Sequence, residues 1–158
     1  MKHLLSALLI LTVFVSCTKE DTTPIPEPVD YTVQNEKEIS DFITANNLTA
    51  QRSDTGLYYV IKEPGTGAQP TATSNVTVAY KGTFLNGQVF TQSSINGDPL
   101  SLNQVIKGWT EGIPHFKEGG TGTLFIPAHL GYGSYNYRGI PGGSVLIFEI
   151  NLISVNSN

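Results

Sequence analysis

Residues 105–112 read VIKGWTEG and contain the only tryptophan of the chain, Trp109. Four further aromatic residues fall on or beside predicted strands: Tyr80, Phe90, Tyr132 and Phe148. The sequence places no nucleophile–base pair and no group with metal-ligand spacing beside them. This combination predicts an apolar pocket that works by shape and by exclusion of water, with no cofactor and no covalent step.

The segments around this stretch predict an α+β fold in which an antiparallel sheet is crossed by one short helix. The helix is predicted over residues 103–112, because Gly112 and Pro114 end it. Asn86 and Gly87 are typical of a two-residue hairpin turn. Strands are predicted over residues 57–62, 76–84, 89–90, 121–126 and 144–153.

A second short helix is predicted over residues 35–47, ahead of the strands. Its apolar residues share one face: Ile39, Phe42 and Ile43. Asn35 is the predicted N-cap with Glu38 as its capping-box partner, and residues 46–47 suit the end of the helix. Such a helix packs on its own domain or forms a dimer contact, and we favour packing.

The first 16 residues predict a secretory signal peptide. A basic end precedes an apolar run over residues 4–15, which is too short to span a bilayer, and Ser16 is a small residue at the exit. Cys17 follows and is the only cysteine, so an internal disulfide is excluded. It is either a free thiol or, as we prefer, the acylated cysteine of a segment that resembles a bacterial lipobox.

The residues after Cys17 predict a tether. Residues 18–30 read TKEDTTPIPEPVD, and their prolines and acidic side chains keep such a segment extended and without a core. Acylation of Cys17 would place the protein at the cell envelope, facing the periplasm or the cell surface. The net charge of −4 gives no electrostatic basis for binding nucleic acid.

Four blocks in a fixed order resemble the FK506-binding (FKBP) type of peptidyl-prolyl cis-trans isomerase. They read VTVAYKGTFLNGQVF at 76–90, VIKGWTEG at 105–112, GYG at 131–133 and IPGGSVLIFEI at 140–150. The resemblance implies a twisted half-barrel of five to six strands wrapped on the short helix. The predicted organisation is a signal peptide at 1–16, a lipidated tether at 17–34, a helix and linker at 35–56, and an isomerase domain at 57–158.

The resemblance also implies roles for the aromatic residues. Trp109 would form the floor of the pocket beneath the proline ring of a substrate. Tyr80, Phe90 and Phe148 would form its walls. Tyr132 would offer its hydroxyl group to the substrate backbone.

Four further positions are implied to bind the substrate. Val105 and Ile106 would lie along it, and the backbone N–H of Ile106 would donate to a substrate carbonyl. Ile140 would contribute from the last loop. Thr91 occupies a position where the family usually has aspartate, which puts the rate of turnover in question.

Two more departures concern the rim of the pocket. The loop over residues 98–103 is about two residues short, and an aromatic residue expected near Leu100 is missing. Residues 142–143 are both glycine where a second proline is usual, which predicts a looser lip.

Two hypotheses for function follow from this resemblance. The first, which we favour, is an isomerase that assists the folding of secreted or envelope proteins. Its partners would be proline-containing polypeptides and macrolides of the FK506 and rapamycin type. The second is a peptide-binding module or holdase that has kept the cleft and lost most turnover, and Thr91 supports it.

Overall fold

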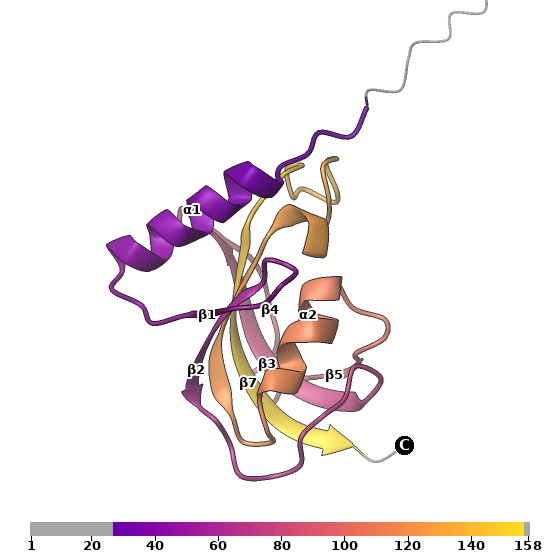
Figure 1. Ribbon diagram of the computed structural model, residues 1–158. Coiled ribbons are helices and arrows are strands. Elements are labelled where there is room, and N and C mark those ends of the chain that lie inside the picture. The colour runs from indigo at the N-terminus through magenta and orange to yellow at the C-terminus, as the bar shows by residue number, and fades with distance from the viewer. Residues whose placement is uncertain (1–26, 157–158) are drawn as a thin grey trace, which may run out of the picture.

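The computed structural model describes residues 27–156, and their strands form one antiparallel sheet (Figure 1). The helices of this part of the chain are α1 (Thr32–Ala45) and α2 (Lys107–Gly112), with short 3₁₀ turns at Ile113–His115 and Ala128–Leu130. The strands are β1 (Gln51–Arg52), β2 (Tyr58–Glu63), β3 (Asn75–Phe84), β4 (Val89–Gln92), β5 (Asp98–Ser101), β6 (Thr121–Ile126) and β7 (Leu146–Asn156).

The order of the strands across the sheet is β1-β2-β6-β7-β3-β4, with β5 also paired to β3. The longest ladder joins β3 to β7, from Asn75 opposite Asn156 to Phe84 opposite Leu146. Leu124 and Ile126 of β6 belong to the main core with Trp109, whereas Phe125 belongs to a second core. Because neighbouring residues of a strand point to opposite faces, α2 and α1 cover opposite faces of the sheet (Figure 1).

The α+β fold with an antiparallel sheet is confirmed, and the sheet has one strand more than the upper number expected. Relative to the five strand ranges predicted from the sequence, the two additional short strands are β1 and β5. Residues 98–101, expected to lie in a loop, pair with β3, with Pro99 opposite Thr77. A proline within four residues hides such a strand from sequence patterns, and it is tolerated here because β5 lies at an edge.

Helix α1 begins earlier than predicted, and its predicted capping box is wrong. Tyr31 is the N-cap residue and makes no capping hydrogen bond through its side chain. Asn35 lies inside the helix and is completely buried, since its amide is used for contacts with distant loops. The predicted end is confirmed, because Asn46 is the C-cap and Asn47 has a positive φ of 52°.

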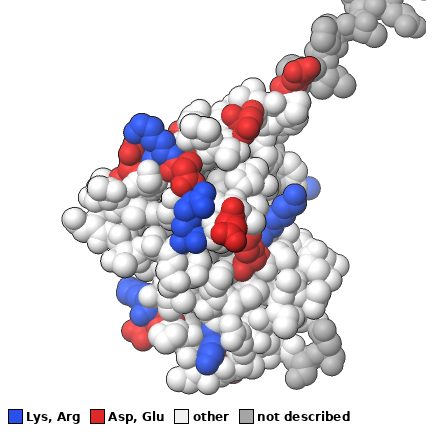
Figure 2. Space-filling view, viewed as in Figure 1, with Lys and Arg blue, Asp and Glu red and all other residues white. Residues whose placement is uncertain are grey.

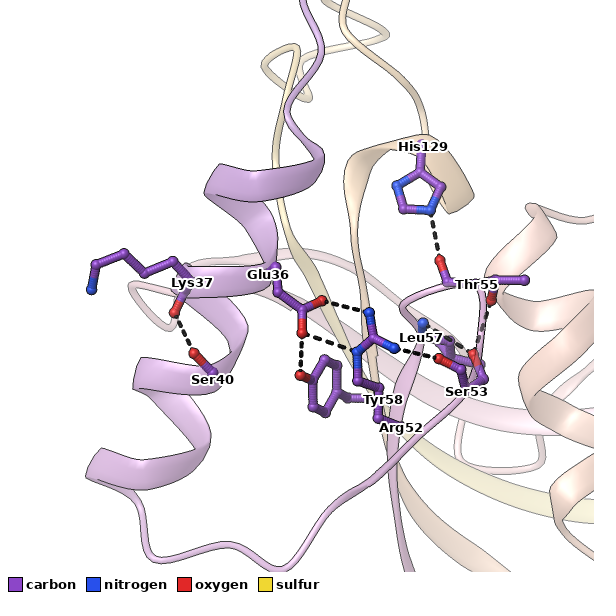
Figure 3. A network of polar contacts seen from close by, with 9 residues as sticks. All are labelled: Glu36, Lys37, Ser40, Arg52, Ser53, Thr55, Leu57, Tyr58 and His129. Carbon is purple, nitrogen blue, oxygen red and sulfur yellow. Dashed lines mark hydrogen bonds and ion pairs between the residues drawn. The ribbon is translucent and has the colours of Figure 1, made fainter.

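The apolar face of α1 packs on the sheet as predicted. Ile39 is fully buried in the second core, and Phe42 and Ile43 pack against the same core. A polar cluster holds the neighbouring side of the helix (Figure 3): the Glu36 carboxylate accepts hydrogen bonds from Arg52 Nε at 2.9 Å and from the Tyr58 hydroxyl at 2.5 Å. The Arg52 bond lowers the pKa of Glu36 more than any other contact, so the carboxylate stays ionised at neutral pH.

Helix α2 is shorter than predicted because residues 103–106 do not join it. Ile106 precedes it in an extended conformation, with φ −61° and ψ 149°. Gly108 and Gly112 are four residues apart and therefore share one face of the helix. A Cβ atom on Gly108 would come within 2.5 Å of Ile126, and one on Gly112 within 2.7 Å of Leu124. These glycines let α2 lie directly against β6, which sets the depth of Trp109.

Charged side chains are sparse and mixed in sign on the face shown in Figure 2, where basic and acidic residues lie next to one another. In the part of the chain that the structure describes, no helix combines the length and the apolar character needed to cross a membrane.

Candidate functional site

An apolar pocket of about 780 Å³ opens between α2, the sheet and the loop before β7. All nine residues that the sequence assigned to the site line this pocket. They are Tyr80, Phe90, Thr91, Val105, Ile106, Trp109, Tyr132, Ile140 and Phe148. The structure thus brings together residues from three strands, one helix and two connecting segments.

Trp109 forms the base of the pocket and is only 4% exposed. The rings of Tyr80 and Phe148 meet it edge-on, with centroid distances of 5.0 and 5.1 Å and an interplanar angle of 86° in both pairs. Edge-to-face packing of this kind fixes ring positions. The Trp109 Nε1 atom is buried and has no hydrogen-bond partner among residues 27–156.

A second row of rings extends the wall toward the β3–β4 turn. Phe90 meets Phe148 edge-on at 5.5 Å, and Phe84 lies 4.9 Å from Phe90. Phe84 was not among the residues expected at the site, although its place at the end of β3 offered a signal. Leu100 lines the pocket where an aromatic residue was expected, so this wall is present with a smaller side chain.

The polar side of the pocket is organised around the Tyr80 hydroxyl group. It donates a hydrogen bond of 3.3 Å to Oδ2 of Asp98, a residue that the sequence analysis did not assign to the site. Asp98 lies on β5 and pairs with Val78 of β3. Val78 is two residues before Tyr80 in β3, so both side chains point to the same face. The Asp98 carboxylate therefore stands near the phenol of a site in which Thr91 replaces the usual aspartate.

Burial raises the pKa of the Tyr80 phenol, and the nearby Asp98 carboxylate adds to this effect, while the Thr91 side chain opposes it. Burial also raises the pKa of Tyr132, and the neighbouring Tyr137 adds to it. Both hydroxyl groups therefore stay protonated at neutral pH. The Tyr80 hydroxyl donates its one hydrogen to Asp98, whereas the Tyr132 hydroxyl can donate to a bound ligand.

The loop before β7 brings residues to the pocket that the sequence analysis left without a role. The Tyr137 ring stacks on Tyr132 at 5.0 Å, and the guanidinium of Arg138 lies 5.3 Å from the centre of the Tyr137 ring. Tyr137 and Ile140 exchange two backbone hydrogen bonds of 2.9 and 2.8 Å, which closes a tight turn. Arg138 has a positive φ of 46° in this turn.

The lip formed by residues 141–143 is held by hydrogen bonds, and the expectation of a looser lip stays a prediction. The N–H of Gly142 donates to Asn136 Oδ1 at 2.9 Å, and the N–H of Gly143 donates to the Gly133 carbonyl at 2.9 Å. The Asn35 amide also donates to the Gly143 carbonyl at 2.9 Å. The lip is therefore joined to both its own loop and α1.

The two histidines among residues 27–156, His115 and His129, lie apart from this pocket. His115 stacks on Tyr59 with a centroid distance of 4.0 Å, and His129 contacts the Thr55 carbonyl at 2.8 Å. Among the described residues no three His, Cys, Asp or Glu side chains form a group suited to a metal ion. What the pocket offers chemically is an aromatic surface accompanied by hydroxyl, amide and backbone hydrogen-bonding groups.

Comparison with known proteins finds similarity over most of the described chain. Residues 67–153 match the family described as FKBP-type peptidyl-prolyl cis-trans isomerase. The FkpA isomerases of Escherichia coli K12 and Aeromonas hydrophila are 45% and 37% identical over 70% and 78% of this chain. This chain spans less than half the length of either relative, 42% and 47% respectively.

Solved structures agree with this match. The crystal structure of FkpA from E. coli has a TM-score of 0.69 and 39% identity, and the match covers 79% of this chain and 61% of that one. An isomerase from Pseudomonas syringae has the same TM-score with 29% identity, covering 80% of this chain and 96% of that one. This chain belongs to the family of FKBP-type peptidyl-prolyl cis-trans isomerases.

Proposed function

We propose that this protein catalyses cis–trans isomerisation of X–Pro bonds in polypeptides and so assists the folding of secreted or envelope proteins. The observation that carries this proposal is the arrangement of nine predicted residues around one apolar pocket with Trp109 at its base. Membership of the isomerase family supports the same conclusion.

The chemistry needs no acid, base or covalent intermediate. Rotation about the X–Pro bond is opposed by amide resonance, with a barrier of roughly 18–20 kcal/mol, and takes tens of seconds or longer uncatalysed. The planar amide is more dipolar than the twisted amide of the transition state. A water-poor aromatic pocket therefore disfavours the ground state more than the transition state, and this difference lowers the barrier.

In this proposal the proline ring rests on Trp109, between the rings of Tyr80, Phe90 and Phe148. The extended backbone at Ile106 offers its N–H to a substrate carbonyl. Val105 and Ile140 then contact the residues next to the proline, and Tyr132 donates from its hydroxyl group.

The direct test is a protease-coupled isomerisation assay with an Ala-Xaa-Pro-Phe peptide and the purified protein. We expect cis-to-trans conversion faster than in buffer and proportional to protein concentration. A rate equal to that of buffer, with far-UV circular dichroism showing a folded protein, would refute catalysis. If the protein binds the peptide without accelerating its isomerisation, it is a holdase, which is the alternative that Thr91 favours.

Macrolide binding is a second part of the proposal, because a rigid apolar ring system would fill the same pocket. Trp109 is the only tryptophan, so its fluorescence reports on this pocket alone. A saturable change on titration with FK506 or rapamycin is expected, together with competitive inhibition of the peptide assay. An unchanged spectrum at full ligand solubility would argue against it.

We further propose that the protein is acylated at Cys17 and held at the cell envelope. Cys17 and the predicted signal peptide lie outside the described residues, so this proposal depends on the sequence pattern. Labelled palmitate should enter the wild type and not the Cys17→Ala variant, and only the wild type should fractionate with membranes. Label in both proteins would disprove modification at this residue.

A further inference from the structure

A second hollow of about 440 Å³ lies beside the aromatic pocket, between the first turns of α1, the β3–β4 turn and the lip. We call it the α1 groove. Its lining residues are Tyr31, Gln34, Glu38, Phe84, Leu85, Asn86, Gln88, Gly139 and residues 141–145. Phe84, Gln88 and Gly139 line both hollows, so the groove is continuous with the pocket.

Both sides of the α1 groove are held in place. The Asn35 amide donates to the Gly143 carbonyl at 2.9 Å and accepts from the Ala128 N–H at 2.8 Å, which ties α1 to the lip. The Tyr31 ring occupies the space that a Cβ atom on Gly143 would need. The Glu36 cluster fixes the helix on its other side (Figure 3). The groove is therefore formed before any ligand arrives.

The lining of the groove suits a polypeptide backbone. Gln34, Asn86 and Gln88 are exposed amides, which can donate to carbonyl groups and accept from N–H groups. Glu38 is the only charged residue among those that line the groove in the described part of the chain. Its carboxylate accepts from Gln34 at 2.8 Å and from Asn35 at 3.0 Å, which fixes its position and leaves lone pairs for a cation.

We propose that the α1 groove binds the segment that flanks the proline of a bound polypeptide, and that Glu38 favours lysine or arginine in that segment. This inference rests on the proposed function, because the proline must occupy the aromatic pocket first. It adds a specificity element from α1, which lies outside residues 67–153 that match the family model.

The test uses the full-length protein and proline peptides extended by up to about six residues on one side or the other, since an extended chain advances about 3.3 Å per residue. Each extension carries a single Lys, Ala or Glu at successive positions. The readout is the ratio of kcat/KM for the Lys peptide to that for the Glu peptide. At the position that reaches Glu38 this ratio should be about two- to fivefold, the range for an exposed ion pair, and should fall with added salt.

Matched variants on α1 separate the groove from general charge effects. Glu38→Lys should invert the ratio, whereas Asp41→Lys makes the same charge change at a position that does not line the groove and should leave it unchanged. Gln34→Trp should block extended peptides by filling the groove, and Lys37→Trp should not. Equal ratios for all extensions, or equal effects of the two charge variants, would overturn the proposal.

Failure of the proposed function gives a different result. In that case the unextended peptide is not isomerised, and fluorescence anisotropy of labelled extended peptides replaces the kinetic readout. Affinity that depends on Lys against Glu and on Glu38, but not on Asp41, would still support the groove. Affinity with no such dependence would refute it.

Discussion

Asn35 gives the strongest prediction, because one side chain joins α1 to two distant loops. Its replacement in Asn35→Ala removes a hydrogen bond to the Gly143 carbonyl and another from the Ala128 N–H, both buried. Leaving a buried polar group without a partner costs about 1–3 kcal/mol, so the two together cost about 2–6 kcal/mol. The higher helix propensity of alanine returns about 0.5 kcal/mol. The net loss is a large part of the roughly 5–15 kcal/mol that holds a typical domain folded.

The assay is thermal unfolding followed by circular dichroism and by Trp109 fluorescence. Gln34→Ala is the control, since it makes a similar propensity change at an exposed neighbouring position of α1. We expect the midpoint temperature of Asn35→Ala to fall by roughly 8–20 °C, against about 0–2 °C for the control. Equal stabilities of Asn35→Ala and the control would refute the assigned role.

A charge variant at the same position extends this test. Asn35→Asp keeps an acceptor for the Ala128 N–H but turns a carboxylate toward the Gly143 carbonyl and Glu38. Burial and the neighbouring carboxylate raise the pKa of the new carboxyl group in the folded state above its unfolded value. The folded variant is therefore more stable at low pH, and this stability is lost as the pH rises through the raised pKa of the new carboxyl group. A variant that is most stable at neutral pH would contradict this placement.

Three further predictions concern the pocket and its surroundings. Trp109→Phe removes a buried N–H that has no partner, so stability should change by less than about 1.5 kcal/mol while turnover falls severalfold; a turnover equal to wild type would exclude Trp109 as the floor. Asp98→Asn should lower kcat by about two- to tenfold by weakening the charged bond to Tyr80, and adding Thr91→Asp should restore it; no recovery in the double variant, with the fold intact, would show that the two positions are not interchangeable. Burial lowers the pKa of His115, so its contribution to stability is present above about pH 6.5 and is lost as the pH falls through the lower folded value. Thermal unfolding between about pH 8 and pH 5 should therefore show a smaller acid loss for His115→Phe than for wild type, and parallel curves would count against it.

The regular elements could be predicted because their hydrophobic patterns are local. Alternation in β3 places Val76 and Val78 on the buried face, and both are fully buried in the main core. The predicted strand over residues 121–126 coincides with β6. Here a short segment carries both the period and the core residues, so no distant partner is needed to interpret it.

The polar contacts could not be predicted from the sequence, because their partners are distant along the chain. An asparagine before an apolar run is typical of an N-cap, yet the Asn35 amide is used for partners 93 and 108 residues away. Arg138 and Tyr137 reach the pocket through a tight turn with positive φ, which has no hydrophobic period. Asp98 reads as a loop residue because Pro99 follows it, and only pairing with β3 brings it to Tyr80.

The two clearest departures from the family pattern have their physical counterparts elsewhere in the chain. Gly143 leaves room for Tyr31, and its carbonyl accepts from Asn35, so the second glycine of the lip belongs with the presence of α1. Thr91 lacks a charge, and Asp98 supplies one to the same phenol from another strand. In both cases a change within or directly after one of the four family-like sequence blocks is matched by a residue outside those blocks. Aspartate at position 91 alone should therefore place two carboxylates at the Tyr80 phenol, and any side chain at position 143 should overlap Tyr31, so only paired exchanges should preserve the site.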